Sequence, residues 1–123
     1  MLVALAVTGC GGDDREEAEQ TVRDFVEATN EKDADKLCDE LLTQDFIERA
    51  TGASGDNAND ACKQQFEVIT GLKLALVRIR RTKVDGDKAQ VTAELRTQGQ
   101  RRIQLLRLEK ESGDWRLAGS TAR

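Results

Sequence analysis

The 123-residue chain contains no histidine, no tyrosine and no proline. Without histidine it cannot build a Ser-His-Asp triad, a Cys-His pair or a histidine metal site. Without tyrosine it also lacks a phenolic acid. Aromatic residues make up only 3% of the sequence, whereas hydrophobic residues make up 38%. This apolar share is sufficient for one small packed domain, and the length leaves little room for a second.

The first nine residues form an uncharged apolar run that ends at Cys10. Such a run is typical of a secretory signal and its cleavage site. Residues Val7-Thr8-Gly9-Cys10 resemble a bacterial lipobox, in which the signal is removed before a cysteine that then carries acyl chains. We therefore expect a signal peptide over residues 1–9, truncated at its start, a lipidated Cys10 with a flexible leash over residues 10–14, and a domain over residues 15–123. The alternative is an ordinary buried strand at the N-terminus.

The two other cysteines agree with export. Once Cys10 is lipidated, Cys38 and Cys62 form an even pair, and an oxidising compartment favours a disulfide between them. The bridge would close a loop of 25 residues, which stabilises a fold by about 3 kcal/mol in the chain-entropy model. The alternative is two buried free thiols. Two thiolates without histidine cannot complete a tetrahedral zinc site, so we expect no metal.

Charge divides the chain into two parts. Residues 1–72 hold 17 acidic and 6 basic side chains, whereas residues 73–123 hold 6 acidic and 13 basic ones. The same boundary separates apolar spacing typical of helices from spacing typical of strands. We therefore expect acidic helices followed by a basic sheet.

Apolar residues in the acidic part recur every three or four positions, as they do in amphipathic helices. Asp33 is a good N-cap for a second helix, and Gly71 is a plausible C-terminal cap for a third. Cys38 and Cys62 both lie on apolar stripes, so a bridge would join the second helix to the third. The sequence predicts a helix over 14–31, a second helical region from 33 that Phe46 and Ile47 close, a loop over 51–59, and a third helix from about 60 to 70.

The basic part predicts an antiparallel meander. Residues 89–96 alternate between apolar and polar, and Val84-Asp85-Gly86-Asp87 is a strong hairpin signal. The apolar phase changes between Leu76 and Val77, and again between Leu105 and Leu106. Each change indicates a bulge, which bends a strand. The expected strands cover residues 72–84, 89–96, 103–108 and 115–117.

This pattern resembles the nuclear-transport-factor-2-like (cystatin-like) fold, and most closely the exported bacterial lipoproteins of that superfamily. The residues that carry the resemblance are Val7 to Cys10, Cys38 with Cys62, and residues 84–91 followed by Asp114-Trp115-Arg116-Leu117. It implies an α+β domain in which N-terminal helices pack on a curved antiparallel four-stranded sheet and form a cone with a pocket. Some members are enzymes, such as ketosteroid isomerase and polyketide cyclases, and others are binding or dimerisation modules.

Catalysis in such a cone needs a general acid or base inside it. The acids that can be placed, Glu27, Asp35 and Glu40, fall on the polar faces of the expected helices. We therefore expect no catalytic residue, no cofactor and no metal. The expected function is a non-enzymatic, lipid-anchored envelope protein on the outer face of the bacterial cytoplasmic membrane, displaying a domain that binds a ligand or a protein. The alternative is a small enzyme of the isomerase or cyclase type that uses a pocket carboxylate.

Cations gather on the predicted strands and suggest a contact surface. An exported protein meets anionic surfaces rather than nucleic acid, although a plain solvated face is the simpler alternative. Other partners compatible with the sequence are a small apolar ligand, another envelope protein, or a second copy held through the sheet. Either Leu106 and Leu108 or Ile103 and Leu105 would lie on the outer face in such a dimer. The expected basic surface comprises Arg78, Arg80, Arg81, Lys83, Arg101, Arg102 and Arg107.

Overall fold

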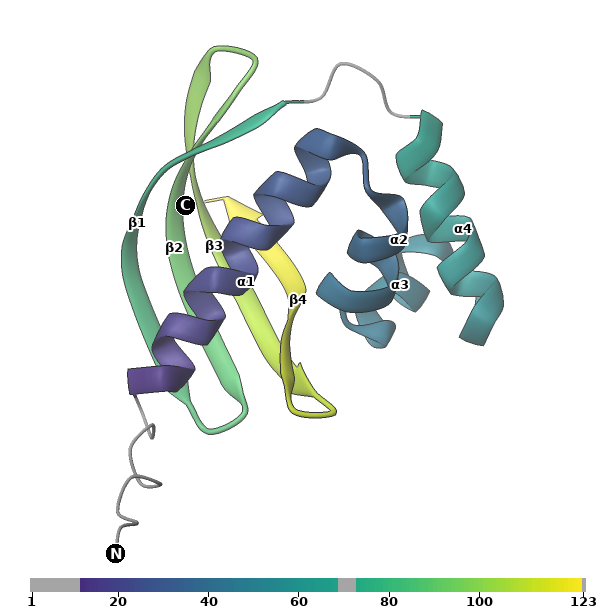
Figure 1. Ribbon diagram of the computed structural model, residues 1–123, viewed down its shortest axis with the longest axis horizontal. Coiled ribbons are helices and arrows are strands. Elements are labelled where there is room, and N and C mark those ends of the chain that lie inside the picture. The colour runs from purple at the N-terminus through teal and green to yellow at the C-terminus, as the bar shows by residue number, and fades with distance from the viewer. Residues whose placement is uncertain (1–11, 69–72, 123) are drawn as a thin grey trace, which may run out of the picture.

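The computed structural model describes residues 12–68 and 73–122. Within them, helices pack against one face of a curved four-stranded antiparallel sheet, as Figure 1 shows. The α+β class and the cone-like arrangement expected from the sequence are confirmed. The expected signal peptide over residues 1–9, the expected lipidation site Cys10 and the expected cap Gly71 lie outside the described residues.

Helix α1 (Gly12–Glu31) lies across the inner, concave face of the sheet and buries an apolar stripe that includes Ala18, Val22 and Val26. Its start differs from the expected leash, because Gly12 to Asp14 are already helical. The carboxylate of Asp14 accepts a hydrogen bond from Nζ of Lys110 at 3.0 Å. Acidic residues stabilise the positive end of a helix, and this contact ties that end to the sheet.

Helix α2 (Ala34–Lys36) begins directly after Asp33, whose carboxylate accepts a hydrogen bond from the backbone N–H of Lys36 at 3.2 Å. The predicted N-cap is therefore confirmed. The helix continues into the π-helical turn η2 (Leu37–Leu41), whose apolar side chains are buried. Cys38 lies in this turn and is one of its buried residues.

Helix α3 (Gln44–Thr51) corrects the expected end of the helical region, because Phe46 and Ile47 lie inside a further helix. Thr43 caps it, with its hydroxyl oxygen accepting from the backbone N–H of Phe46 at 3.1 Å. The backbone N–H of Thr43 in turn donates to the carbonyl of Leu117 at 3.0 Å. The helix start is therefore fixed by a strand distant in sequence.

Helix α4 (Gly55–Val68) begins at Gly55 rather than near Asp60, so the expected loop is shorter than predicted. The carboxylate of Glu48 on α3 accepts a hydrogen bond from the backbone N–H of Gly55 at 3.0 Å. That bond satisfies one of the unpaired donors at the start of a helix. A polar segment typical of loops is helical here because a neighbouring helix caps it.

The four strands of the sheet lie side by side in sequence order, and every neighbouring pair is antiparallel. The last strand is longer than expected. The edge of the sheet formed by this strand is covered at one point, since Leu42 pairs with Leu117 in an isolated bridge. The strands are β1 (Leu74–Asp85), β2 (Lys88–Thr97), β3 (Gln100–Glu111) and β4 (Asp114–Ala122).

Bulges bend β1 and β4. The register between β1 and β2 leaves Val77 and Arg80 as extra residues on β1, which confirms the bulge predicted for the first strand. The bulge predicted within the third strand is wrong, because β2 and β3 pair without a shift, and the extra residue is Ala118 on β4. The change of apolar phase in β3 does not reflect a bulge, because this strand carries half-buried apolar residues on its outer face. Ile103 and Leu105 lie there, opposite the inward-facing Leu106 and Leu108.

Candidate functional site

A cleft of about 180 Å³ lies at the end of the cone near the β2–β3 hairpin. Side chains alternate between the two faces of a strand, so Leu95 of β2 and Leu106 of β3 both point inward. The hairpin that aligns them turns at Gln98 and Gly99, with φ of 53° and 82°, in the left-handed region that glycine adopts most readily. The cleft is lined by Phe25, Leu74, Leu95, Leu106 and Leu117, with Thr97, Arg102, Gln104 and Ser120.

The cleft is lined mainly by apolar side chains, and one cationic group, the guanidinium of Arg102, lies among them. Ser120 Oγ donates to Gln104 Oε1 at 2.7 Å, and Nη2 of the exposed Arg102 donates to Gln100 Oε1 at 3.2 Å. No carboxylate is among the described residues that line the cleft. The lining can therefore hold an apolar group and an anion, and it contains no candidate general base.

The volume limits what can enter. Small-molecule sites usually measure about 300–1,000 Å³, so a cleft of about 180 Å³ admits only a small ligand or part of a larger one. The acids placed from the sequence lie elsewhere, since Glu27, Asp35 and Glu40 are all exposed, as predicted. The expected alternative, a carboxylate inside the cone, finds no candidate in the described lining.

A wider groove of about 400 Å³ lies outside the cone, between α1, η2 and the β3–β4 turn. Glu17, Glu40 and Asp114 line it and are exposed to solvent. Nη1 of Arg116, also in the lining, donates to the carbonyl of Asp39 at 2.8 Å. The groove is polar and open, so it lacks the enclosure that would strengthen an electrostatic interaction with a substrate.

The predicted basic surface is only partly assembled. Strand pairing places Arg78, Arg81, Lys83, Arg101 and Arg107 on the outer, convex face of the sheet. The two remaining residues depart from it. Arg80 is the extra residue of a β1 bulge, and Arg102 lines the cleft on the inner face. Sequence reasoning missed one member, Arg96 of β2, which pairs with Arg101 across the outer face. The alternation of β2 was the signal that could have found it.

Glu94 is the buried acid of the outer face, with 3% of its surface exposed. Its Oε1 lies 3.1 Å from Nε of Arg78, and its Oε2 lies 2.9 Å from Nε of Arg101. A buried carboxylate is stable only when paired and hydrogen-bonded, and here each oxygen has its own guanidinium. Sequence reasoning assigned Glu94 only to the polar face of its strand.

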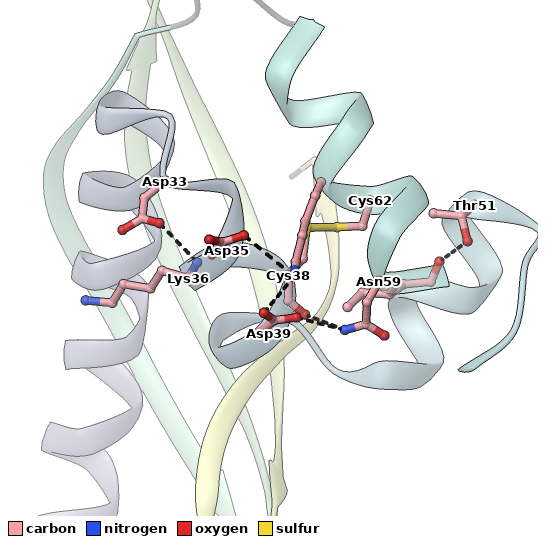
Figure 2. Close-up of a disulfide and its surroundings, with 10 residues drawn as sticks. Asp33, Asp35, Lys36, Cys38, Asp39, Thr51, Asn59 and Cys62 are labelled. Atoms are coloured by element: carbon pink, nitrogen blue, oxygen red, sulfur yellow. Dashed lines mark hydrogen bonds and ion pairs between the residues drawn. A yellow bond between two sulfur atoms is a disulfide. The ribbon is translucent and has the colours of Figure 1, made fainter. Parts of the chain in front are cut away.

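The predicted disulfide is confirmed, with Cys38 and Cys62 bonded and their Cα atoms 6.1 Å apart. It joins η2 to α4, as Figure 2 shows. Nδ2 of Asn59 donates to the carbonyl of Cys38 at 3.3 Å and to Oδ1 of Asp39 at 3.2 Å. Lys63 Nζ lies 2.9 Å from Oδ2 of Asp39. The hydrogen bond from Asp39 raises the pKa of Lys63 above its ordinary value of 10.5. The bridge and its polar neighbours therefore stabilise the helical layer.

Across residues 12–68 and 73–122, no helix combines the length and apolarity needed to cross a bilayer. Nor do these residues bring three or more acidic or cysteine side chains together in a way that could hold a metal ion.

No protein-family model and no curated protein matches the sequence. Solved structures are similar to it in fold. The Kfla4162 protein from Kribbella flavida has a TM-score of 0.66 at 17% identity, covering 92% of this chain and 91% of that one. An NTF-2-like protein of unknown function from Silicibacter pomeroyi has a TM-score of 0.60 at 18% identity, covering 93% and 98%. A protein named provisionally as a scytalone dehydratase, from Novosphingobium aromaticivorans, has a TM-score of 0.59 at 19% identity, covering 90% and 83%.

These identities show the fold alone. The shared fold agrees with the resemblance found in the sequence. The chain therefore has the nuclear-transport-factor-2-like fold, with a small apolar cleft at the open end of its cone.

Proposed function

We propose that this protein is a lipid-anchored binding protein of the bacterial envelope, and that its cleft binds a small apolar ligand with an anionic end group. The observation that carries the proposal is the lining of the cleft. Apolar side chains surround the space, and the guanidinium of Arg102 lies at its border. Guanidinium groups bind carboxylates through paired hydrogen bonds. A short-chain carboxylate therefore matches both the volume and the chemistry.

The anchored location is supported by two features. Residues Val7 to Cys10 resemble a lipobox, and the Cys38–Cys62 disulfide suits a protein that matures in an oxidising compartment. Mass spectrometry of the native protein from membranes tests the anchor directly. We expect an acylated Cys10 as the first residue. An unmodified Cys10 with residues 1–9 attached would contradict the proposal.

Ligand binding is tested by titrating the purified full chain with hexanoate and with hexanol, followed by NMR shifts of the cleft residues. Arg102→Gln should weaken hexanoate binding at least fivefold and leave hexanol binding unchanged. Leu95→Phe fills the cleft and should abolish binding of both compounds. The matched control is Arg96→Gln, which removes the same charge from the outer face and should change neither.

Equal effects of Arg102→Gln and Arg96→Gln would show that only overall charge matters, and would overturn the assignment of the cleft. Unchanged binding in Leu95→Phe would overturn it as well. The enzymatic alternative has one supporting comparison, the provisional scytalone dehydratase, but the described lining offers it no base. Turnover of a hydroxylated ketone that survives Arg102→Gln would favour that alternative.

A further inference from the structure

The outer face of the sheet carries cations in rows. Directly opposed residues on neighbouring strands share a face, which gives the pairs Arg81 with Thr92 and Lys83 with Gln90 on β1 and β2. Arg107 of β3 lies opposite Gln90, and Arg101 lies opposite Arg96. We call this set the outer basic stripe. Its members are Arg78, Arg81, Lys83, Arg96, Arg101 and Arg107.

Most of these charges are unneutralised. Glu94 is the one carboxylate that pairs with the stripe among the described residues, and it is engaged by Arg78 and Arg101. No described carboxylate lies within ion-pair distance of Arg81 or Lys83. The same is true of Arg96 and Arg107, and all four side chains are exposed. The stripe therefore has a net positive charge at its surface, which attracts anions.

A shallow hollow of about 130 Å³ lies within the stripe, lined by Arg81, Lys83, Gln90, Thr92 and Leu105. Four of these side chains can donate hydrogen bonds, from a guanidinium, an ammonium, an amide and a hydroxyl group. The oxygens of a phosphate group only accept such bonds when it is ionised. The hollow therefore suits one phosphate and is too small for a drug-sized molecule, which needs about 300 Å³ or more.

Cations continue from this hollow toward the β2–β3 hairpin, and Arg107 flanks it on β3. Toward the β1–β2 hairpin the outer face instead carries Asp85 and Glu109 on either side of Lys88. Positions on the same face of a strand are about 6.6 Å apart, and neighbouring strands are about 4.8 Å apart. An extended polymer with regularly spaced phosphates can contact several members of the stripe at once, and each contact releases counterions. We propose that the outer basic stripe binds a linear phosphodiester polymer, one phosphate of which lies in the hollow.

Other occupants fit less well. The aromatic residues are three phenylalanines and one tryptophan. The phenylalanines lie on helices and the tryptophan is buried on β4, so the stripe offers no platform for stacking nucleic-acid bases. Val77 and Val68 are the exposed large hydrophobic residues of the described chain. Val68 lies on α4, and Val77 is the extra residue of a β1 bulge. A stable protein interface usually has an apolar or aromatic centre, whereas the apolar residues of β3 on this face, Ile103 and Leu105, are half-buried among polar and charged side chains.

The anchoring membrane is also disfavoured, an argument that rests on the proposed lipidation of Cys10. Only Gly11 separates Cys10 from the first residue of α1, Gly12. One extended residue spans at most about 3.6 Å. Helix α1 packs on the concave face (Figure 1) and strand pairing places the stripe on the convex face, so roughly 10 Å of packed layers separates them. With α1 intact, this short tether limits how far the convex face can turn toward the membrane that holds the anchor.

The test is calorimetric titration of the purified full chain with poly(glycerol phosphate) at several salt concentrations. Arg81→Gln with Lys83→Gln should weaken binding at least tenfold and reduce the slope of log affinity against log salt by about 1.4, or about 0.7 for each of the two cations removed. Glu94→Gln removes the stripe's carboxylate and should strengthen binding severalfold. The matched control, Arg15→Gln with Lys32→Gln, removes two exposed charges from the helical layer and should have little effect. Circular dichroism verifies that each variant is folded.

Three further probes distinguish the sources of phosphate. We expect weaker binding to inorganic phosphate, to oligothymidylate of equal charge, and to phosphatidylglycerol vesicles. Equal affinity for inorganic phosphate, tighter binding to either of the other two, or an equal loss in the control variant would overturn the proposal. So would a salt-dependent dimer, seen in sedimentation, that the Arg81 and Lys83 changes dissolve. Arg102→Gln should leave polymer binding unchanged, so the cleft and the stripe can fail independently.

Discussion

The side-chain amide of Asn30, near the end of α1, hydrogen-bonds both backbone groups of Leu74, at the start of β1. Nδ2 donates to the carbonyl oxygen at 2.7 Å, and Oδ1 accepts from the backbone N–H at 2.7 Å. Since β1 is an edge strand, these groups have no further strand to pair with. The amide therefore takes the place of a neighbouring strand and holds the helix to the edge of the sheet.

Asn30→Ala should destabilise the protein by about 1–3 kcal/mol, because two partly buried backbone groups lose their partners. Urea unfolding followed by Trp115 fluorescence measures the change. Gln20→Ala is the matched control, since it removes an exposed amide of α1 that bonds Asp24, and it should stay within about 0.5 kcal/mol. Equal losses in both variants would show that Asn30 acts only through helix propensity.

The disulfide should contribute about 3 kcal/mol to the free energy of unfolding, because it restricts the unfolded chain. Unfolding with and without a phosphine reductant measures this contribution. The double variant Cys38→Ala with Cys62→Ala should already be less stable and should not respond to the reductant. An oxidised wild type that is no more stable than the reduced protein would contradict the prediction.

Lys110 should titrate visibly through Trp115. Its Nζ lies 5.3 Å from the centroid of the indole ring, and its hydrogen bond to the carboxylate of Asp14 raises the pKa of Lys110 above 10.5. A raised pKa means that the charge stabilises the fold fully below pH 10.5, and that this stabilisation is lost as the pH rises through the folded value. The chain has one tryptophan and no tyrosine, so alkaline fluorescence titration is free of phenol ionisation.

In that titration the wild type should show a fluorescence transition centred above pH 10.5, and melting temperatures should fall over the same range. Lys110→Met keeps most of the side chain without the charge and should lack the fluorescence transition. The same transition in this variant would show that another group is responsible. Detachment of the start of α1 from β3 is the physical event we expect.

Lys32 directly follows α1 and adopts the left-handed conformation, with φ of 58°. The backbone N–H of Asp33 donates to the carbonyl of Ala28 at 2.9 Å, as in the Schellman motif. In that motif glycine usually occupies the left-handed position, which Lys32 holds here. Lys32→Gly should therefore stabilise the fold by about 0.5–1 kcal/mol, because it relieves the conformational strain. Lys36→Gly, in helical backbone, should instead destabilise it by about 1 kcal/mol. Thermal unfolding compares the two, and a loss in both would contradict the assignment.

Local signals were sufficient for much of the fold. Apolar spacing located the stripe of α1, the carboxylate of Asp33 marked the start of α2, and the segment Val84-Asp85-Gly86-Asp87 marked the first hairpin. The parity of cysteines predicted the bridge of Cys38 to Cys62. Each of these depends on residues close in sequence, or on counting, and needs no knowledge of neighbours in space.

The errors came from contacts between different helices and strands, which apolar spacing does not reveal. Helix α3 begins where it does because the backbone of Thr43 bonds β4, and α4 begins early because Glu48 bonds Gly55. The bulge expected within β3 is on β4, because register depends on both strands of a pair.

The candidate sites depended even more on tertiary structure. Arg101 and Arg102 are adjacent in sequence and were assigned to one surface, yet period-two alternation places them on opposite faces. One belongs to the outer basic stripe and the other borders the cleft. The sequence by itself determined the two layers, their opposite charges and the bridge between helices. Only the tertiary structure decided which face each charge occupies and where the cone stays open, because both depend on strand register and on the helix that packs across the sheet.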